Sequence, residues 1–122
     1  MEKLYTLEIE DRNAYLYALA GGDRLTSGIS IEYWNEIAER CFELGRSKIL
    51  IEKNFIESVT PAEMLEMAEH VAKLLPTWRI AFVDRYDHDG INELGKKLVR
   101  NRDVMMQIFK NVNDAERWLL AN

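Results

Sequence analysis

Apolar residues occur along this chain in short runs, separated by longer segments in which they recur every three or four positions. The short runs predict strands at residues 4–10, 14–20, 49–51, 79–84 and 104–109. The longer segments predict helices at about residues 30–44, 60–75, 91–100 and 113–119. The order β-β-α-β-α-β-α-β-α indicates an α/β protein with a mixed, mainly parallel sheet whose parallel strands are joined by right-handed crossovers.

The first two strands are predicted to form a hairpin. Leu7 and Ile9 alternate with acidic residues, and residues 11–13 (Asp-Arg-Asn) supply turn chemistry. The second strand is apolar on both faces, which is typical of an inner strand. The glycine-containing segment 21–28 is predicted to be a plain loop, since it has neither the Walker nor the dinucleotide-binding spacing.

Capping residues predict where the helices begin. Ser30, Asp89 and Asn113 are expected to cap the first, third and fourth helices, and the second opens with a capping box from Thr60 to Glu63. The polar stretch from Lys53 to Thr60 is then a loop between a short buried strand and this helix. Ligands and partners tend to meet parallel sheets at such places. This loop is therefore the expected contact surface.

Composition narrows the class of protein. The 122 residues, 48% apolar and 30% charged, predict a single domain over residues 1–122. A net charge of −5 argues against general binding of nucleic acid or of anionic lipid surfaces. The single cysteine, Cys41, falls in a helical apolar pattern and is expected in the core. No apolar run predicts a signal core or a membrane span, so we expect a cytoplasmic protein without membrane insertion.

Several segments together resemble a known family over nearly the whole chain. They are Gly22-Asp-Arg-Leu-Thr26, Lys48-Ile-Leu-Ile51, Arg79-Ile-Ala-Phe-Val83, Ile108-Phe109 and Asn113-Asp-Ala-Glu-Arg-Trp-Leu119. The chain resembles the STAS domains, and among them the small bacterial proteins described as SpoIIAA-like or STAS/SEC14-type. The resemblance implies a helix-covered sheet, no metal or organic cofactor, and a regulatory role.

The resemblance also implies a candidate modification site. In the anti-sigma-factor antagonists of this fold, a kinase phosphorylates a serine at the start of the second helix, and Ser58 lies at the matching place, near Thr60. Those antagonists carry an Asp-Ser-Ser-Gly type of motif, whereas this chain has Glu57-Ser-Val-Thr60. Phosphorylation and a plain loop or capping role both stay open. Asn54, Glu57, Ser58 and Thr60 are therefore the candidate residues for phosphorylation or partner contact.

The densest group of metal-capable side chains is the segment Asp84-Arg-Tyr-Asp-His-Asp-Gly90. An EF-hand register fails here, because Gly90 in the sixth position would place Arg85 first and Lys96 twelfth. A strand-to-helix turn explains the same residues. No serine stands on a Gly-x-Ser-x-Gly elbow, so a hydrolase or transferase using Asp84, Asp87, His88 or Ser58 is only an alternative. We predict no catalytic, cofactor or metal residues.

A local basic patch is predicted in this acidic chain. It comprises Lys96, Lys97, Arg100 and Arg102, which would receive an acidic partner, a phosphate or a lipid head group, or would form a solvated helix face.

The leading hypothesis is a non-enzymatic regulatory or protein-interaction module, with an unidentified protein partner and compatible with a homodimer. The alternative is a small-molecule or lipid carrier in which helices part over the sheet. Its adaptable lining would include Met64, Met67, Met105 and Met106.

Overall fold

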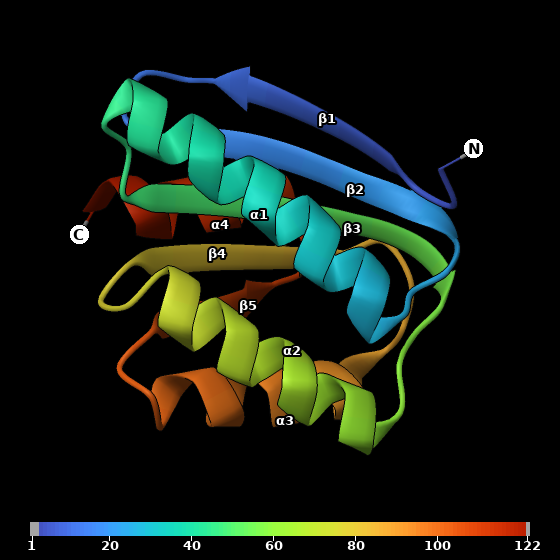
Figure 1. Cartoon of the computed structure of the whole chain (residues 1–122). Coiled ribbons are helices and arrows are strands. Elements are labelled where there is room, and N and C mark those ends of the chain that lie inside the picture. Colours follow the sequence, from blue (N-terminus) through green and yellow to red (C-terminus); the bar gives the residue numbers. More distant parts are fainter. Residues whose placement is uncertain (1–2, 122) are drawn as a thin grey trace.

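The computed structural model describes residues 3–121. It has strands β1 (Thr6–Asp11), β2 (Leu16–Arg24), β3 (Lys48–Glu57), β4 (Arg79–Asp84) and β5 (Met105–Phe109). Its helices are α1 (Ser27–Leu44), α2 (Pro61–Leu74), α3 (Asp89–Arg100) and α4 (Val112–Ala121). The five strands lie in the order β1-β2-β3-β4-β5, with β1 antiparallel to β2 and all other neighbours parallel (Figure 1). The predicted α/β class, element order and inner position of the second strand are confirmed.

Helices cover both faces of this sheet. The strands from β2 to β5 are added in one direction, and crossovers of one hand then place the connecting helices α1, α2 and α3 on the same face (Figure 1). Helix α4 follows the last strand and lies behind the sheet in this view. The sheet is therefore the middle of three layers.

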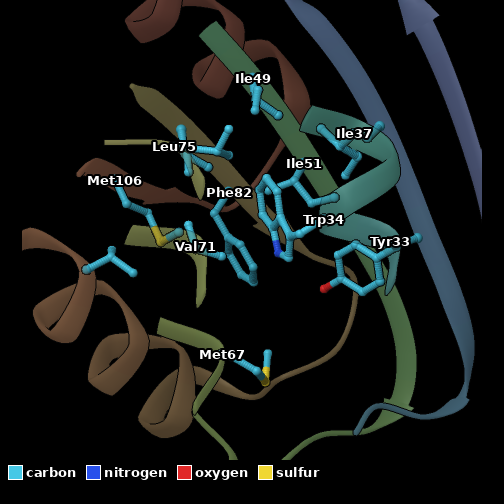
Figure 2. Packing of buried hydrophobic residues seen from close by; sticks show 14 of the residues in the cluster. Tyr33, Trp34, Ile37, Ile49, Ile51, Met67, Val71, Leu75, Phe82 and Met106 are labelled. Carbon is cyan, nitrogen blue, oxygen red and sulfur yellow. The ribbon is translucent and has the colours of Figure 1, made fainter. Parts of the chain in front are cut away.

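Two hydrophobic cores lie on the two faces. Alternate residues of β3 point to opposite sides, so Ile49 and Ile51 enter the front core under α1–α3 while Leu50 enters the rear core under α4. Figure 2 shows Trp34 of α1, Val71 of α2 and Phe82 of β4 meeting in the front core. The rear core has six buried members: Tyr15, Leu50, Ala81, Val83, Ala115 and Leu119. Cys41 is fully buried in the front core, as predicted.

Strand β2 is longer than predicted, because its two glycines continue the pairing with β3. Residues 21 and 22 continue the strand, with Gly21 opposite Asn54 and Gly22 opposite Phe55, so the predicted loop from residue 21 is wrong. A Cβ on Gly21 would lie 2.9 Å from the Asn54 carbonyl oxygen, and one on Gly22 would lie 2.8 Å from the Leu4 carbonyl oxygen. These glycines serve close backbone packing rather than a turn.

The third strand is also longer than its apolar run. It continues to Glu57, so Lys53 lies inside β3 and the prediction of a loop starting there is wrong. Pairing with β2 continues as far as Glu57, whereas pairing with β4 ends at Lys53, opposite Asp84. The true connection to α2 is only residues 58–60.

The predicted capping residue is confirmed at α2, whereas the predictions for the other three helices are wrong. Thr60 and Glu63 form the predicted capping box, with Glu63 N donating to Thr60 Oγ1 at 3.2 Å. Thr26 rather than Ser30 caps α1, since its Oγ1 accepts from Ile29 N at 3.1 Å. Gly45, at φ 69°, ends α1 in a left-handed conformation.

The last two helices begin earlier than their predicted caps. His88 occupies the position before α3, so Asp89 lies inside the helix. At α4 the side chain of Asn111, not Asn113, accepts from Asp114 N at 2.8 Å. In both places two polar residues compete for the capping role, and the sequence alone does not rank them.

Candidate functional site

The carboxyl ends of β3 and β4 bring a group of polar side chains to the front face of the sheet, which α1, α2 and α3 cover. Lys53 and Asp84 are partners in the register of the two strands. Asn92 of α3 is buried against them, with only 5% of its surface exposed. His88, just before α3, completes the group. Lys53, Asp84, His88 and Asn92 are called the edge cluster below.

Asp84 is the centre of the edge cluster. Its Oδ1 accepts from Tyr86 N at 2.9 Å, and its Oδ2 lies 2.8 Å from His88 Nδ1 and 2.9 Å from Asn92 Nδ2. His88 Nε2 in turn lies 3.1 Å from the Ile56 carbonyl oxygen. These contacts tie β3, β4 and α3 together. These hydrogen bonds hold the Asp84 carboxylate in one orientation at the end of β4.

Lys53 differs from the other members of the edge cluster, because its side chain forms no hydrogen bond with residues 3–121. Its side chain is 94% buried, since its exposed fraction is 6%. Nζ lies 4.9 Å from the centroid of the Phe82 ring and makes neither a hydrogen bond nor a salt bridge with residues 3–121. Burial lowers the pKa of the Lys53 amine to about 8, and the nearby negative charge of Asp84 opposes this shift. A desolvated, unpaired amine of this kind is uncommon in a protein interior.

A cavity of about 40 Å³ lies next to Lys53, between the sheet and helices α1, α2 and α3. Met64, Met67 and Met106 line it, together with Trp34 and Phe82. Met105 points elsewhere and is exposed, so the expectation that it belongs to such a lining is wrong. A small, mostly apolar hollow therefore lies under the helices, and its use by a carrier stays a prediction.

The predicted contact residues lie at the solvent-facing end of β3. Glu57 and Thr60 are exposed, while Asn54 and Ser58 are partly buried. Ile56 is 55% exposed although it is apolar, and its neighbours Phe55 and Val59 are buried. This alternation anchors the segment and presents one hydrophobic side chain to solvent. Its role in phosphorylation or partner contact stays a prediction.

The predicted basic residues lie on and just beyond α3. Three of them have partners: Lys96 Nζ lies 3.2 Å from Glu93 Oε2, Arg100 Nε donates to the Met106 carbonyl oxygen at 2.8 Å, and an Arg102 N–H donates to the Leu98 carbonyl oxygen at 2.9 Å. Lys97 is exposed. These contacts fasten the end of α3 to its surroundings, and binding of an acidic partner here stays a prediction.

The aspartates of the segment from Asp84 to Gly90 border one shallow hollow but have different partners. Asp84 is turned inward to His88 and Asn92, whereas Asp89 is exposed and lies 3.4 Å from Lys110 Nζ. Within residues 3–121, no three histidine, cysteine, aspartate or glutamate side chains are arranged to hold a metal ion.

A second buried acid, Glu52, lies on the rear face. Its oxygens accept from Tyr17 Oη at 2.5 Å and from Arg85 Nε at 2.7 Å. Burial alone would raise the pKa of the Glu52 carboxyl, but the hydrogen bonds from Arg85 and Tyr17 outweigh it and lower the pKa.

The sequence pattern alone assigned no role to Glu52, and none to Lys53 as an individual residue. The signal was the alternation Ile49, Ile51, Lys53, Phe55, which continues a buried strand face through a lysine.

None of the described helices is both long enough and apolar enough to cross a membrane.

Comparison with known proteins identifies the fold. No protein-family model matches the chain, and no curated protein is significantly similar to it in sequence. An anti-sigma factor antagonist from Mycobacterium paratuberculosis is similar in structure, with a TM-score of 0.63, 13% identity, and coverage of 95% of this chain and 94% of that chain. An uncharacterized protein of the DUF3478 family with a SpoIIAA-like fold, from Shewanella loihica PV-4, matches with a TM-score of 0.59, 16% identity, and coverage of 94% and 93%. The chain therefore has the SpoIIAA-like fold of STAS domains, as its sequence predicts.

Proposed function

We propose that this protein is a non-enzymatic regulatory module of STAS type that acts by binding another protein. The observation that carries the proposal is the end of β3, where residues 54–60, called the contact edge below, present an exposed Ile56 beside exposed polar groups. The structural similarity to an anti-sigma factor antagonist, a protein named for opposing a regulator, supports the same class.

The contact edge is well ordered by its surroundings. β3 pairs with β2 as far as Glu57, His88 lies 3.1 Å from the Ile56 carbonyl oxygen, and the capping box fixes Thr60. A partner binding there loses little conformational entropy of the loop. A single exposed isoleucine flanked by polar groups suits a small interface centred on one apolar anchor.

Ser58 would act as the switch of this surface. It lies between Glu57 and the capped start of α2, and phosphorylation would add about two negative charges there. Beside Glu57 and Glu63 this charge would alter the electrostatics of the contact edge without entering the core. We therefore propose that modification of Ser58 regulates partner binding.

The test is affinity capture of partners from a lysate of the native host. Ile56→Asp removes the apolar anchor, and Leu65→Asp is the matched control, because Leu65 is 41% exposed on α2 outside the contact edge. We expect a protein captured by the wild type and by Leu65→Asp but lost with Ile56→Asp. Retention of the same proteins by Ile56→Asp, with thermal unfolding unchanged, would contradict the proposal.

A second candidate function, binding of a small molecule, is favoured by the cavity beside Lys53. An amine without a hydrogen-bonding partner among residues 3–121 is uncommon in a protein interior, and the methionine side chains beside it can adjust to a ligand. Native mass spectrometry of protein purified from its host tests this function, since a retained ligand adds mass that denaturation removes. A mass equal to that of the bare chain in every preparation would count against it.

A further inference from the structure

The cavity between the sheet and helices α1, α2 and α3 has a single charged residue in its lining. Lys53 provides that charge, and no acidic side chain lines the cavity. The remaining lining is apolar except for Ser30 and Asn92. A charge in such surroundings is unfavourable unless it is paired, so an anion bound in the cavity would stabilise the charged form of Lys53.

Asp84 does not complete it. Although Asp84 is the strand partner of Lys53, its oxygens accept from Tyr86, His88 and Asn92, and it forms no salt bridge with Lys53. The ammonium group of Lys53 therefore retains three N–H donors without a protein acceptor. Water or an acceptor group of a ligand must satisfy them, and Lys53 Nζ is not among the fully enclosed side-chain atoms that lack a partner.

A second donor borders the same cavity. Ser30 lies within α1 and is fully buried, and its Oγ has no hydrogen-bond partner of normal length among the described residues, although the Tyr33 hydroxyl lies close enough to interact with it. The amide nitrogen of Asn92, by contrast, is already used by Asp84. One ammonium and one free hydroxyl together suit a group with two acceptor oxygens and a negative charge, which is a carboxylate.

The apolar lining sets the size of the rest of the ligand. The volume of about 40 Å³ is room for about three waters or for a short chain of carbon atoms. Met64 packs closely on Gly95 of α3, since a Cβ on Gly95 would lie 2.8 Å from the Met64 sulfur atom. Flexible methionines on α2 and β5 would adjust to the tail of a small acid.

We propose that this cavity binds a small aliphatic monocarboxylate, whose carboxylate group contacts Lys53 and Ser30 and whose tail lies among Met64, Met67 and Met106. This inference deepens the second candidate function and is independent of the contact edge. The ligand neutralises the charge of Lys53 and fills the hollow under the three helices.

Binding of an anion should be coupled to uptake of a proton. The Lys53 amine has a pKa of about 8, and a bound carboxylate favours its charged form. Asp84 on β4, with His88 bonded to it, is the nearest charged group, and α1, α2 and β5 bring no charged side chain to the cavity. Titration at pH 8 should therefore take up about half a proton for each butanoate bound.

The experiment is isothermal titration of the full chain with butanoate, with butanamide as the neutral ligand of the same shape. Repeating it in HEPES and in Tris, which differ in ionisation enthalpy, measures the proton uptake. We expect saturable binding of butanoate at a ratio of one to one. The affinity for butanamide should be lower than that for butanoate by at least about ten-fold, as expected for loss of a charged hydrogen-bonded pair.

Two variants test the site independently. Lys53→Met keeps an unbranched side chain as far as Cε and removes the charged amine, and it should weaken butanoate binding by about ten-fold or more. Gly95→Ala keeps Lys53 but adds a methyl group to the cavity lining, 2.8 Å from the Met64 sulfur atom, and it should also weaken binding. If Lys53→Met fails to fold, Gly95→Ala still tests the location.

Equal affinity for butanoate and butanamide, undiminished binding by both variants, or no saturable binding of butanoate at millimolar concentration would each overturn the proposal. The outcome separates it from the broader function. A neutral molecule retained in native mass spectra, with no binding of butanoate, would uphold a small-molecule carrier and reject the carboxylate ligand.

Discussion

At the scale of single residues, Lys53 should be a source of instability when no ligand is bound. Burial shifts its pKa from 10.5 down to about 8, so below pH 8 the folded state must hold an unfavourable charge. We expect Lys53→Met to raise the free energy of unfolding at pH 7 by about 1–3 kcal/mol.

The sign of the pH dependence makes this prediction specific. Between pH 8 and 10.5 the unfolded chain keeps the proton on Lys53 while the folded chain releases it, so the stability of the wild type rises with pH in this window. The advantage of Lys53→Met should therefore shrink from pH 7 to pH 10. Urea unfolding of both proteins at these two pH values measures the difference. A constant difference would show that the folded amine keeps its ordinary pKa.

The charge of Glu52, unlike that of Lys53, should stabilise the folded state. Hydrogen bonds from Arg85 and Tyr17 outweigh the burial of Glu52 and lower its pKa in the folded state. Glu52→Gln should reduce the free energy of unfolding at pH 7 by about 1 kcal/mol. The stabilisation by Glu52 is present above the unfolded pKa and is lost as the pH falls through the lower folded pKa. Chemical denaturation at pH 7 and pH 3.5 checks this, with Glu66→Gln, on an exposed part of α2, as the neutral control.

At the scale of elements, the glycines of β2 are tied to the packing of its neighbours. A Cβ on residue 21 would meet the Asn54 carbonyl oxygen at 2.9 Å, so Gly21→Ala should destabilise the protein by about 1–3 kcal/mol. Gly28→Ala is the matched control, because its nearest neighbour would be Thr26 Oγ1 at 3.8 Å and alanine favours the helix. Thermal unfolding of the two variants compares them. Equal melting temperatures would mean that β2 and β3 separate easily at this point.

The same strands show what the sequence allows and where it fails. Strands of pure apolar residues, such as residues 80–83, and the capping box at Thr60 are predictable because a local pattern determines them. The extension of β2 through Gly21 and of β3 through Lys53 depends on partners distant in the chain, and glycine and lysine locally favour a loop. The contact edge is therefore visible in the sequence, whereas the role of Lys53 depends on three helices that meet only in the fold.

At the scale of the whole molecule, the two cores are joined through single strands. Ile51 packs in the front core and Leu50, the next residue along, packs in the rear core, so neither core can loosen without disturbing the backbone of the other. We expect the protein to unfold as one cooperative unit. The cavity and the contact edge are both built on β3, so both depend on this unit being folded.

The rear core provides the sharpest test of this unity, because it depends on α4. Leu119 is fully buried there, and Leu119→Ala should lower the free energy of unfolding by about 2–4 kcal/mol. Leu120→Ala, on the same helix but 51% exposed, should change it by less than about 0.5 kcal/mol. Methyl resonances of Leu50 and Ile51, followed by NMR during urea unfolding of Leu119→Ala, should disappear at one midpoint. If Leu50 loses its native signal while Ile51 keeps it, the two faces of the sheet unfold independently, and coupling through β3 must be abandoned.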